Sequence, residues 1–404
     1  WEGNISKIIS SLKLRGTYGL VGNDAIGSVD DRFFYLSQVN PNYGTYGYTF
    51  GSEFGNRING VLEERQENRN ITWETSRKLN VGAEMELFNS ASLVVDLYRE
   101  HRNNILMTRA HTPNTLGVVV LPQANVGEAK SQGIDASLEL NKRFSSGWFI
   151  SGRGNVTYAK SEYVKYEEPD YSNTPWLTRV GLPIGQQFGF VAERLFIDDQ
   201  EAYNSPQQFG KVLGGDIKYK DIDGDGVITN LDMVPIGFPT TPGMTYGFGF
   251  SLSFKSIDFS SFLQGSSKSS FWIDAAGTAP FVSNATGENN QLLRAYADDH
   301  WSEDNRNLYA LWPRFNEMRS DNNTKLSTWF MRNGSFLRIK QVELGYTFKE
   351  TLTRRMGVEK LRLYISGTNL YNFSKFKLWD PEMGGNGLGY PLQRVYNLGI
   401  KCDL

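Results

Sequence analysis

The chain has 404 residues, and its 42 lysines and arginines against 44 aspartates and glutamates give a formal net charge of −2. Hydrophobic residues make up 39% and charged residues 21%, which excludes a disordered or low-complexity chain. The balanced charge argues against a nucleic-acid-binding protein, because such a protein needs a basic excess to neutralise phosphates. A single cysteine, Cys402, excludes an internal disulfide framework and a cysteine-based metal site, and three histidines disfavour a histidine-rich metal enzyme.

The hydropathy of the chain bears on whether it inserts into a membrane. No uninterrupted apolar stretch of about 18 residues occurs, so the sequence encodes no transmembrane helix. The 13% of aromatic residues, the 41 glycines and the mean hydropathy of −0.43 are compatible with a membrane β-barrel, whose strands alternate and keep hydropathy low. Because the chain begins at Trp1 and not at Met, we expect it to be part of something longer, and the missing signal peptide says nothing about compartment.

Apolar and polar residues alternate with a period of two along most of the chain, which predicts β-strands. In Lys78–Leu87, for example, Leu79, Val81 and Met85 fall on one face, and Glu84 and Glu86 on the other. Several of the predicted strands are longer than the five to six residues usual in soluble sheets. In chain order the ten strands are Ser11–Leu20, Lys78–Leu87, Leu93–Met107, Ile134–Leu140, Trp148–Tyr158, Tyr246–Phe254, Ile257–Leu263, Val342–Phe348, Leu361–Asn369 and Tyr396–Leu404.

A soluble sandwich and a membrane barrel both produce this alternation, and they differ in what the apolar face contacts. Aromatic residues near strand ends favour the barrel, because they would form a girdle at the membrane interface. The expected girdle residues are Tyr18, Trp73, Tyr98, Trp148, Tyr158, Tyr246 and Tyr346. On the barrel interpretation a mixed-charge lumen lining is predicted, which includes Lys13, Arg15, Glu84, Glu86, Arg153 and Asn155.

The connections decide in favour of the barrel. They alternate between short and long, as periplasmic turns and extracellular loops do in outer-membrane barrels. The short ones lie near Asn89–Ala91, Phe144–Gly147, Lys255–Ser256 and Lys349–Lys360, and the long ones cover Val21–Arg69, Thr108–Gln132, Ala159–Met244, Gly265–Gly334 and Leu370–Gln393. The alternation requires that the strand-like segment Gln187–Phe196 lies inside a long loop.

We therefore predict an all-β fold: a transmembrane antiparallel β-barrel segment of about ten strands with long extracellular loops. Ten strands would close only a small barrel for loops of this size, so a 22-stranded barrel with a plugged lumen is the better fit. Residues 1–404 would then be its C-terminal portion, and the N-terminal plug and first strands would precede Trp1.

The final predicted strand alternates to the last residue, with Tyr396, Leu398, Ile400, Cys402 and Leu404 on one face. This pattern resembles the C-terminal signature by which outer-membrane barrels are recognised for assembly, with Leu404 in place of the usual terminal aromatic. Cys402 is expected to face lipid as a small apolar residue.

A calcium-like loop lies in the third long connection. The segment Asp221-Ile-Asp-Gly-Asp-Gly-Val-Ile-Thr-Asn-Leu-Asp232 matches an EF-hand loop closely. Hard Ca²⁺ takes six to eight oxygen ligands, and carboxylates at positions 1, 3 and 5 around a tight glycine turn supply three. The predicted ligands of a structural Ca²⁺ ion are Asp221, Asp223, Asp225, the carbonyl of Val227, and Asp232, while Ile228 would anchor the loop in apolar contacts. A solvated turn without metal is the alternative interpretation.

No phosphate-binding loop, nucleophile elbow or His-Glu-x-x-His motif occurs, so no catalytic residue is predicted and the chain is not expected to be an enzyme. An aromatic stretch, Phe33–Tyr35 followed by Tyr43, Tyr46, Tyr48 and Phe50, falls in a predicted extracellular loop. It is compatible with stacking on sugar rings, with a protein contact, or with packing inside its own loop.

Six segments, in order and almost end to end, resemble SusC-like (RagA-like) TonB-dependent transporters. They are Ile5–Ala25, Asn70–Asn80, Asn125–Asp135, Asp216–Gly237, Gly334–Phe348 and Ser366–Glu382. The resemblance corresponds to about the C-terminal two-fifths of such a protein. It implies a 22-stranded barrel in the outer membrane of a Gram-negative bacterium of the Bacteroides–Flavobacterium type.

The resemblance also implies a function and partners. Such transporters import oligosaccharides or oligopeptides, work with a SusD-like surface lipoprotein as a lid, and draw energy from TonB through the N-terminal part. Outer-membrane lipid and a glycan or peptide cargo are the other expected contacts, and nucleic acid is not one. The alternative function, from the residues alone, is a secreted, calcium-stabilised, β-rich carbohydrate-binding module.

Overall fold

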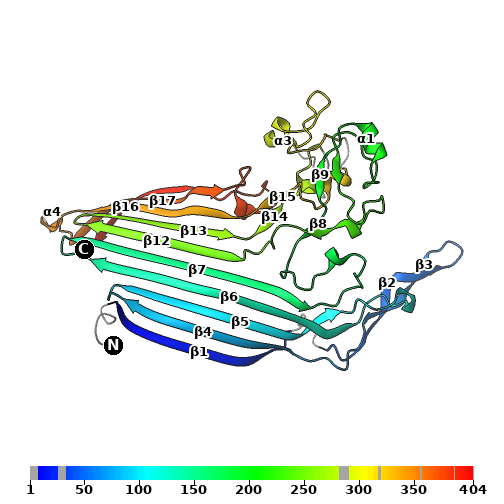
Figure 1. Ribbon diagram of the computed structural model, residues 1–404, viewed down its shortest axis with the longest axis horizontal. Helices are drawn as coiled ribbons and strands as arrows, with labels where there is room; N and C mark the ends of the chain where they lie inside the picture. Colours follow the sequence, from blue (N-terminus) through cyan, green and yellow to red (C-terminus); the bar gives the residue numbers. More distant parts are fainter. Residues whose placement is uncertain are drawn as a thin grey trace.

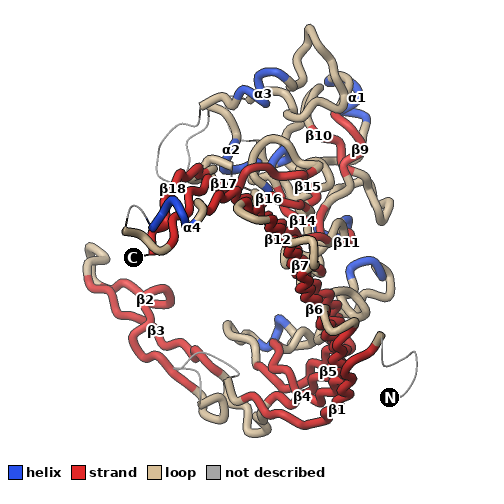
Figure 2. Tube along the Cα trace, turned by 90° about the vertical axis from the view of Figure 1, so that its left-hand side faces the viewer, coloured by secondary structure: helices blue, strands red, loops and turns tan. Residues whose placement is uncertain are grey.

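The computed structural model describes residues 8–25, 33–281, 291–316, 320–354, 357–385 and 387–403. Ten long strands form one antiparallel sheet in the order β1-β4-β5-β6-β7-β12-β13-β16-β17-β18. Figure 1 shows them side by side, and Figure 2 shows the sheet as an open arc. They are β1 (Ile9–Asn23), β4 (Glu74–Leu87), β5 (Ala91–Thr108), β6 (Gln123–Arg143), β7 (Trp148–Lys165), β12 (Met244–Phe254), β13 (Ile257–Ser267), β16 (Phe336–Thr347), β17 (Lys360–Ser374) and β18 (Val395–Asp403).

All ten predicted strands are present, and the short and long connections alternate as predicted. At one end of the sheet, which we call the turn end, the strands are joined by residues 88–90, 144–147, 255–256 and 348–359, the last with helix α4 (Glu350–Thr353). At the other end, the loop end, the connections are residues 24–73, 109–122, 166–243, 268–335 and 375–394. Leu404, the last residue of the predicted signature, lies outside the described residues.

Strand ends at the loop end differ most from the prediction. β6 begins at Gln123 and not at Ile134, and β7 runs to Lys165 and not to Tyr158, so parts of two predicted loops are strand. The connection 24–73 also carries an unpredicted hairpin, β2 (Gln38–Phe50) with β3 (Asn56–Arg65), which projects from the loop end in Figure 1. The aromatic stretch at Tyr43–Phe50 belongs to β2, with Tyr46, Tyr48 and Phe50 exposed.

The longer connections fold into a separate mass, which we call the outer unit and which consists of the packed parts of residues 166–243, 268–335 and 375–394. Its regular elements are β8 (Phe188–Gly189), β9 (Ala192–Leu195), α1 (Asp199–Asn204), β10 (Ile217–Tyr219), β11 (Val234–Pro235), β14 (Ser270–Trp272), α2 (Ala275–Thr278), α3 (Arg294–Asp298) and β15 (Met331–Asn333). Because β8 and β9 lie here, the strand-like segment Gln187–Phe196 is inside a long connection, as predicted.

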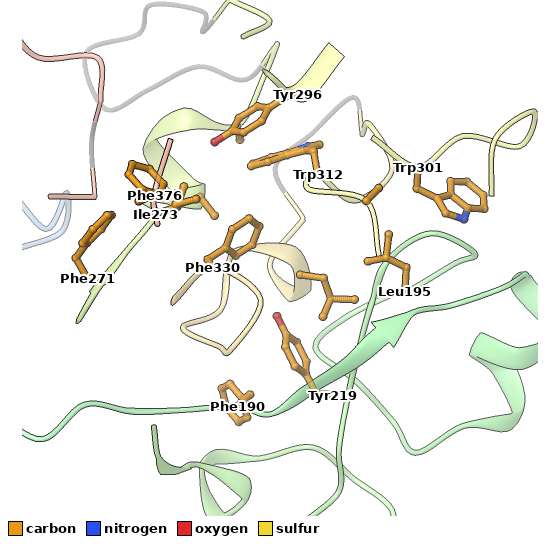
Figure 3. Close-up of a cluster of buried hydrophobic side chains, with 14 of the residues drawn as sticks. Phe190, Leu195, Tyr219, Phe271, Ile273, Tyr296, Trp301, Trp312, Phe330 and Phe376 are labelled. Atoms are coloured by element: carbon orange, nitrogen blue, oxygen red, sulfur yellow. The ribbon is translucent and has the colours of Figure 1, made fainter. Parts of the chain in front are cut away.

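The hydrophobic core of the described residues lies in the outer unit and not against the long sheet. Its fully buried members include Ile217 and, as Figure 3 shows, Leu195, Tyr219 and Tyr296, all from the connections. Large apolar side chains of the sheet are instead exposed: Leu398 at 77% and Ile400 at 70%, with Leu14 at 72%. A soluble sandwich would bury these side chains under a second sheet, so the exposed apolar face is that of a membrane barrel wall. Within the described residues, no helix is long and apolar enough to cross a membrane.

Candidate functional site

The two faces of the sheet carry different chemistry. On the polar face, Lys13 pairs with Glu84 at 3.3 Å, and Arg15 pairs with Asp96 at 2.5 Å, two strands away. Arg362 of β17 pairs in the same way with Asp258 of β13, across β16. Side chains converge on the concave side of an arc, so bridges that pass over an intervening strand place the polar face on the inside, where a barrel has its lumen. The predicted mixed-charge lining is confirmed for Lys13, Arg15 and Glu84, and Asp96, Asp258 and Arg362 add to it.

Glycines make these bridges possible. Gly82 lies on β4 between Arg15 and Asp96, and a Cβ atom there would overlap both side chains. Gly345 on β16 lies beneath the guanidinium of Arg362 in the same manner. A side chain at either position would block the approach of the charged groups across the strand.

The outer face carries the predicted aromatic residues at its edges. Trp148 stacks on Phe254 with ring centroids 4.6 Å apart at the turn end, and Tyr18 and Tyr346 are exposed on the same face. Tyr98 is an exception and corrects the prediction. It shares the polar face with Gly133, and a Cβ atom on that glycine would overlap its phenol ring. In β5 the odd-numbered side chains point outward, and Tyr98, with an even number, points to the polar face. Nearness to a strand end was therefore not sufficient to assign an aromatic residue to the girdle.

A cavity of about 930 Å³ lies on the polar face near the loop end. It is lined by strand residues of that face, among them Asn155, Phe262 and Gln264. Trp272 of the outer unit also lines it. The guanidinium of Arg153 lies 5.0 Å from the centre of the Phe262 ring, which fixes that ring against the wall. Amides, hydroxyls and aromatic faces together can hold a polar, extended molecule by hydrogen bonding and stacking.

Arg338 holds the connection 375–394, part of which lines this cavity, against β16. The side chain is 3% exposed, and its Nη2 lies 2.6 and 2.7 Å from the two carboxylate oxygens of Asp380 and 2.6 Å from Glu382. Both acids belong to the connection 375–394, and Glu382 also lines the cavity. The Asp274 amide donates to the carbonyl of Gly385 at 3.0 Å, which joins the same connection to the connection 268–335. The only indication of these contacts in the sequence pattern is that Arg338 interrupts the apolar run Phe336–Ile339.

The calcium-like loop is an outward part of the outer unit. The carboxylate oxygens of Asp221, Asp223 and Asp225 lie within 4.8 Å of one another. Asp221 accepts hydrogen bonds from the amides of Gly224 (2.7 Å) and Gly226 (2.9 Å), and both glycines have positive φ, which the tight turn requires. The structure thus brings together the three acids that the sequence spacing predicts.

The other predicted ligands of this loop are placed differently. The carboxylate of Asp232 is buried and accepts hydrogen bonds from the amides of Ile222 (2.7 Å) and Thr229 (2.8 Å), so it closes the loop as part of a capping box. Val227 forms a bridge with Gln207, because the Gln207 amide donates to Gly226 and its carbonyl accepts from Ile228. Ile228 is 3% exposed in the core of the outer unit, so its anchoring role is confirmed.

The neighbouring carboxylates of this loop act on the ionisation of Asp223. The Asp225 amide donates a hydrogen bond that lowers the pKa of the Asp223 carboxyl, but desolvation and the carboxylates of Asp232, Asp225 and Asp221 outweigh it, so the pKa is raised overall. Three carboxylates this close repel one another, and a bound divalent cation would remove that repulsion. The donor set, all hard oxygens, fits Ca²⁺.

An ion-paired glutamate gives the outer unit a defined response to acid. Glu201 accepts hydrogen bonds from Arg194 (2.9 and 2.6 Å) and Lys218 (3.1 Å), and the pairing with Arg194 is the main reason why its pKa falls from 4.5 to about 2. A depressed pKa means that the ionised form of Glu201 stabilises the folded state at pH values above the unfolded pKa. This stabilisation is lost as the pH falls from about 4.5 towards 2.

We expect Glu201→Gln to reduce this acid dependence of stability, measured by unfolding of the outer unit between pH 6 and 2. Glu303→Gln, an exposed acid of the same unit, should leave the profile unchanged, and an unchanged Glu201→Gln profile would contradict the expectation.

Residues 7–370 match the family described as "TonB dependent receptor-like, beta-barrel". The chain is 26% identical to TonB-dependent receptor P3 of Formosa agariphila, over 98% of this chain and 40% of the relative. It is 25% identical to TonB-dependent receptor SusC of Bacteroides thetaiotaomicron, over 98% of this chain and 38% of the relative. The chain thus spans about 40% of the length of the curated relatives it matches.

A solved structure with a similar fold supports this family match. The chain is similar to the structure of the RagAB peptide transporter with a TM-score of 0.68 and 21% identity, over 98% of this chain and 41% of the matched chain. The family match covers most of the chain, and the exposed apolar face and polar concave face are those of a barrel wall. The chain therefore belongs to the TonB-dependent receptor β-barrel family, whose SusC-like members are outer-membrane proteins.

Proposed function

We propose that this chain is the C-terminal part of an outer-membrane transporter of the SusC type, which imports oligosaccharides or oligopeptides. The observation that carries the proposal is the cavity of about 930 Å³ on the lumen face, which is lined by amides, hydroxyls and aromatic rings. In the proposed mechanism, cargo is held by this wall, and energy from TonB reaches the barrel through the N-terminal part of the transporter. No reaction chemistry is assigned to the chain.

A SusD-like lipoprotein lid is the proposed partner, and the outer unit is its proposed contact surface. The outer unit supports this because it stands at the loop end with its own hydrophobic core, which gives a partner a rigid surface. The similarity to SusC and to the RagAB transporter is consistent with a two-protein assembly. A full-length transporter purified without any bound lipoprotein, and with these connections accessible to proteases, would contradict the proposed contact.

The cargo proposal is tested with the full-length transporter carrying Phe262→Ala and Trp272→Ala together. Binding of labelled oligosaccharide and oligopeptide mixtures should weaken by about tenfold or more for one of the two classes, because stacking on two rings is lost. The matched control is Phe248→Ala on β12, which removes an aromatic ring from the lipid face. Equal binding by the cavity variant and the wild type would remove the cavity from the transport path.

Ca²⁺ held by Asp221, Asp223 and Asp225 is proposed to stabilise the outer unit, with the Val227 carbonyl and Asp232 as the further predicted ligands. Millimolar Ca²⁺ outside the cell would saturate even a weak site and stabilise the fold by about 1–3 kcal/mol at 10–100 times Kd. We expect a melting temperature several degrees higher in Ca²⁺ than in chelator for the wild type, and no difference for Asp223→Ala/Asp225→Ala. Asp304→Ala, an exposed acid elsewhere in the unit, is the control. A wild-type melting temperature that does not respond to chelator would end the proposal.

A further inference from the structure

Basic side chains gather on the lipid-facing side of the sheet, at the edge of its apolar band nearest the loop end. Strand β6 shows the change from apolar to basic side chains on the outward face. Along this strand Ile134, Ala136, Leu138 and Leu140 point outward, and Gln132 and then Lys130 point the same way towards the loop end. The group, which we call the basic belt, consists of Arg77, Arg99, Lys130, Lys160 and Lys268.

Register places these residues in two adjacent rows across four strands. One row pairs Arg77 with His101, His101 with Lys130, and Lys130 with Glu162. The next row towards the apolar band pairs Arg99 with Gln132, and Gln132 with Lys160. Neighbouring strands are about 4.8 Å apart, so four strands present a surface about 14 Å wide. Lys268, whose Nζ lies 4.2 Å from the Tyr158 ring centre, extends the belt towards β13.

The belt has an excess of positive charge in a chain whose net charge is −2. Lys130 and Lys160 share one carboxylate, Glu162, at 2.6 and 3.0 Å, and the other nearby acid, Glu128, faces His101 at 3.5 Å. Arg77 and Arg99 are exposed and form no ion pair within the part of the chain that the structure describes. Two guanidinium groups without an ionic partner among the described residues therefore stand at the edge of the apolar band nearest the loop end.

We propose that the basic belt binds the phosphate groups of lipids in the outer leaflet. The apolar band fixes the depth of the barrel in the bilayer, and the belt continues directly from it, so its cations lie at headgroup height. Arginine presents a planar fork that matches phosphate oxygens, and several cations together favour a headgroup with more than one phosphate. Because these side chains point away from the lumen and from the cavity, the proposal does not depend on the proposed cargo transport.

The test uses the intact barrel in detergent, titrated with diphosphoryl and monophosphoryl lipid A and followed by native mass spectrometry. Removing two belt charges in Arg77→Gln/Arg99→Gln should weaken diphosphoryl lipid A binding about twentyfold, since each basic residue near a surface contributes about a fivefold effect. Monophosphoryl lipid A should bind the wild type more weakly, and added salt should weaken both. The control, Lys13→Gln/Lys78→Gln, removes two basic residues from the lumen face and should bind like the wild type.

Each other outcome overturns the proposal. Equal affinity of the Arg77→Gln/Arg99→Gln variant and the wild type for diphosphoryl lipid A would show that the two arginines do not contact the lipid. An equal loss in the lumen control would show a response to net charge alone. Inorganic phosphate that displaces lipid A at equal concentration would identify a site for free anions and not for lipid. Lys130→Gln/Lys160→Gln gives a second variant should the arginine variant fail to assemble, and the same twentyfold loss is expected of it.

Discussion

Replacing Arg338 by methionine should detach the connection 375–394 from the lumen wall. The guanidinium is buried and neutralises Asp380 and Glu382, so its loss leaves two carboxylates without their partner in a partly desolvated site. Removing one member of a buried ion pair costs about 3–5 kcal/mol. Trypsin cleavage after Lys375 and Lys377, which lie in this connection, should therefore become roughly a hundredfold faster.

The matched control is Arg354→Met, which breaks the exposed pair of Arg354 with Glu350 in α4. Exposed pairs contribute about 0–1 kcal/mol, so cleavage in the connection 375–394 should not change. Arg338→Lys should restore only part of the protection, because an ammonium group cannot make the same fork of contacts. Cleavage of Arg338→Met at the wild-type rate would show that other contacts, such as that of Phe376 with Phe271, hold the connection without the ion pairs.

Replacing Trp312 by alanine should loosen the outer unit and leave the barrel wall intact. The indole is 4% exposed, stacks on Tyr296 with ring centroids 4.2 Å apart, and lies 5.6 Å from the Phe330 ring (Figure 3). Truncating a buried tryptophan to alanine costs about 3–5 kcal/mol through lost burial and the cavity that remains. The amides of Leu195 and Ile217 should then exchange hydrogen roughly a hundredfold faster or more, while those in the middle of β6 keep their wild-type rates.

Tyr309→Ala is the control within the same unit, because its side chain is 70% exposed and surface changes usually stay within about 0.5 kcal/mol. Equal acceleration in β6 and in the outer unit would mean that the two unfold together. That result would contradict a separate core for the outer unit.

The long strands were predictable because each crosses an apolar layer. Inside that layer the alternation is strict, as in Tyr246–Phe254, and β12 (Met244–Phe254) matches the prediction closely. Beyond the layer both faces of a strand meet water, so the alternation is lost although the hydrogen-bonded ladder continues. This is why β6 was predicted to begin at Ile134 and begins at Gln123, in the polar segment Gln123–Gly133. The hairpin β2–β3 was missed although Tyr46, Tyr48 and Phe50 alternate in β2, because the whole segment Val21–Arg69 was assigned to a long connection.

Sites built from residues close together in the sequence were predicted, and sites built from residues far apart in the sequence were not. Asp221, Asp223 and Asp225 come together because a local turn with two glycines is sufficient to place them. The cavity and the contacts of Arg338 join residues more than 40 positions apart, and only the assembled strands bring them together. In the same way Asn322 and Asn323 hold β10 by hydrogen bonds to the Ile217 backbone, which no local pattern indicates. Asp232 stands at the predicted spacing, and the hydrogen bonds of its buried carboxylate to the amides of Ile222 and Thr229 are a feature of the folded loop that spacing alone does not indicate.

The bridges of Arg15 to Asp96 and of Arg362 to Asp258 have a mechanical consequence. Each joins strands that share no backbone hydrogen bonds, over a glycine in the strand between, so its length depends on how strongly the wall bends at that point. Flattening the wall would pull the charged groups apart, and tighter bending would press the guanidinium onto the glycine backbone. These bridges therefore set the local radius of the barrel wall, because any change of curvature would lengthen or compress them.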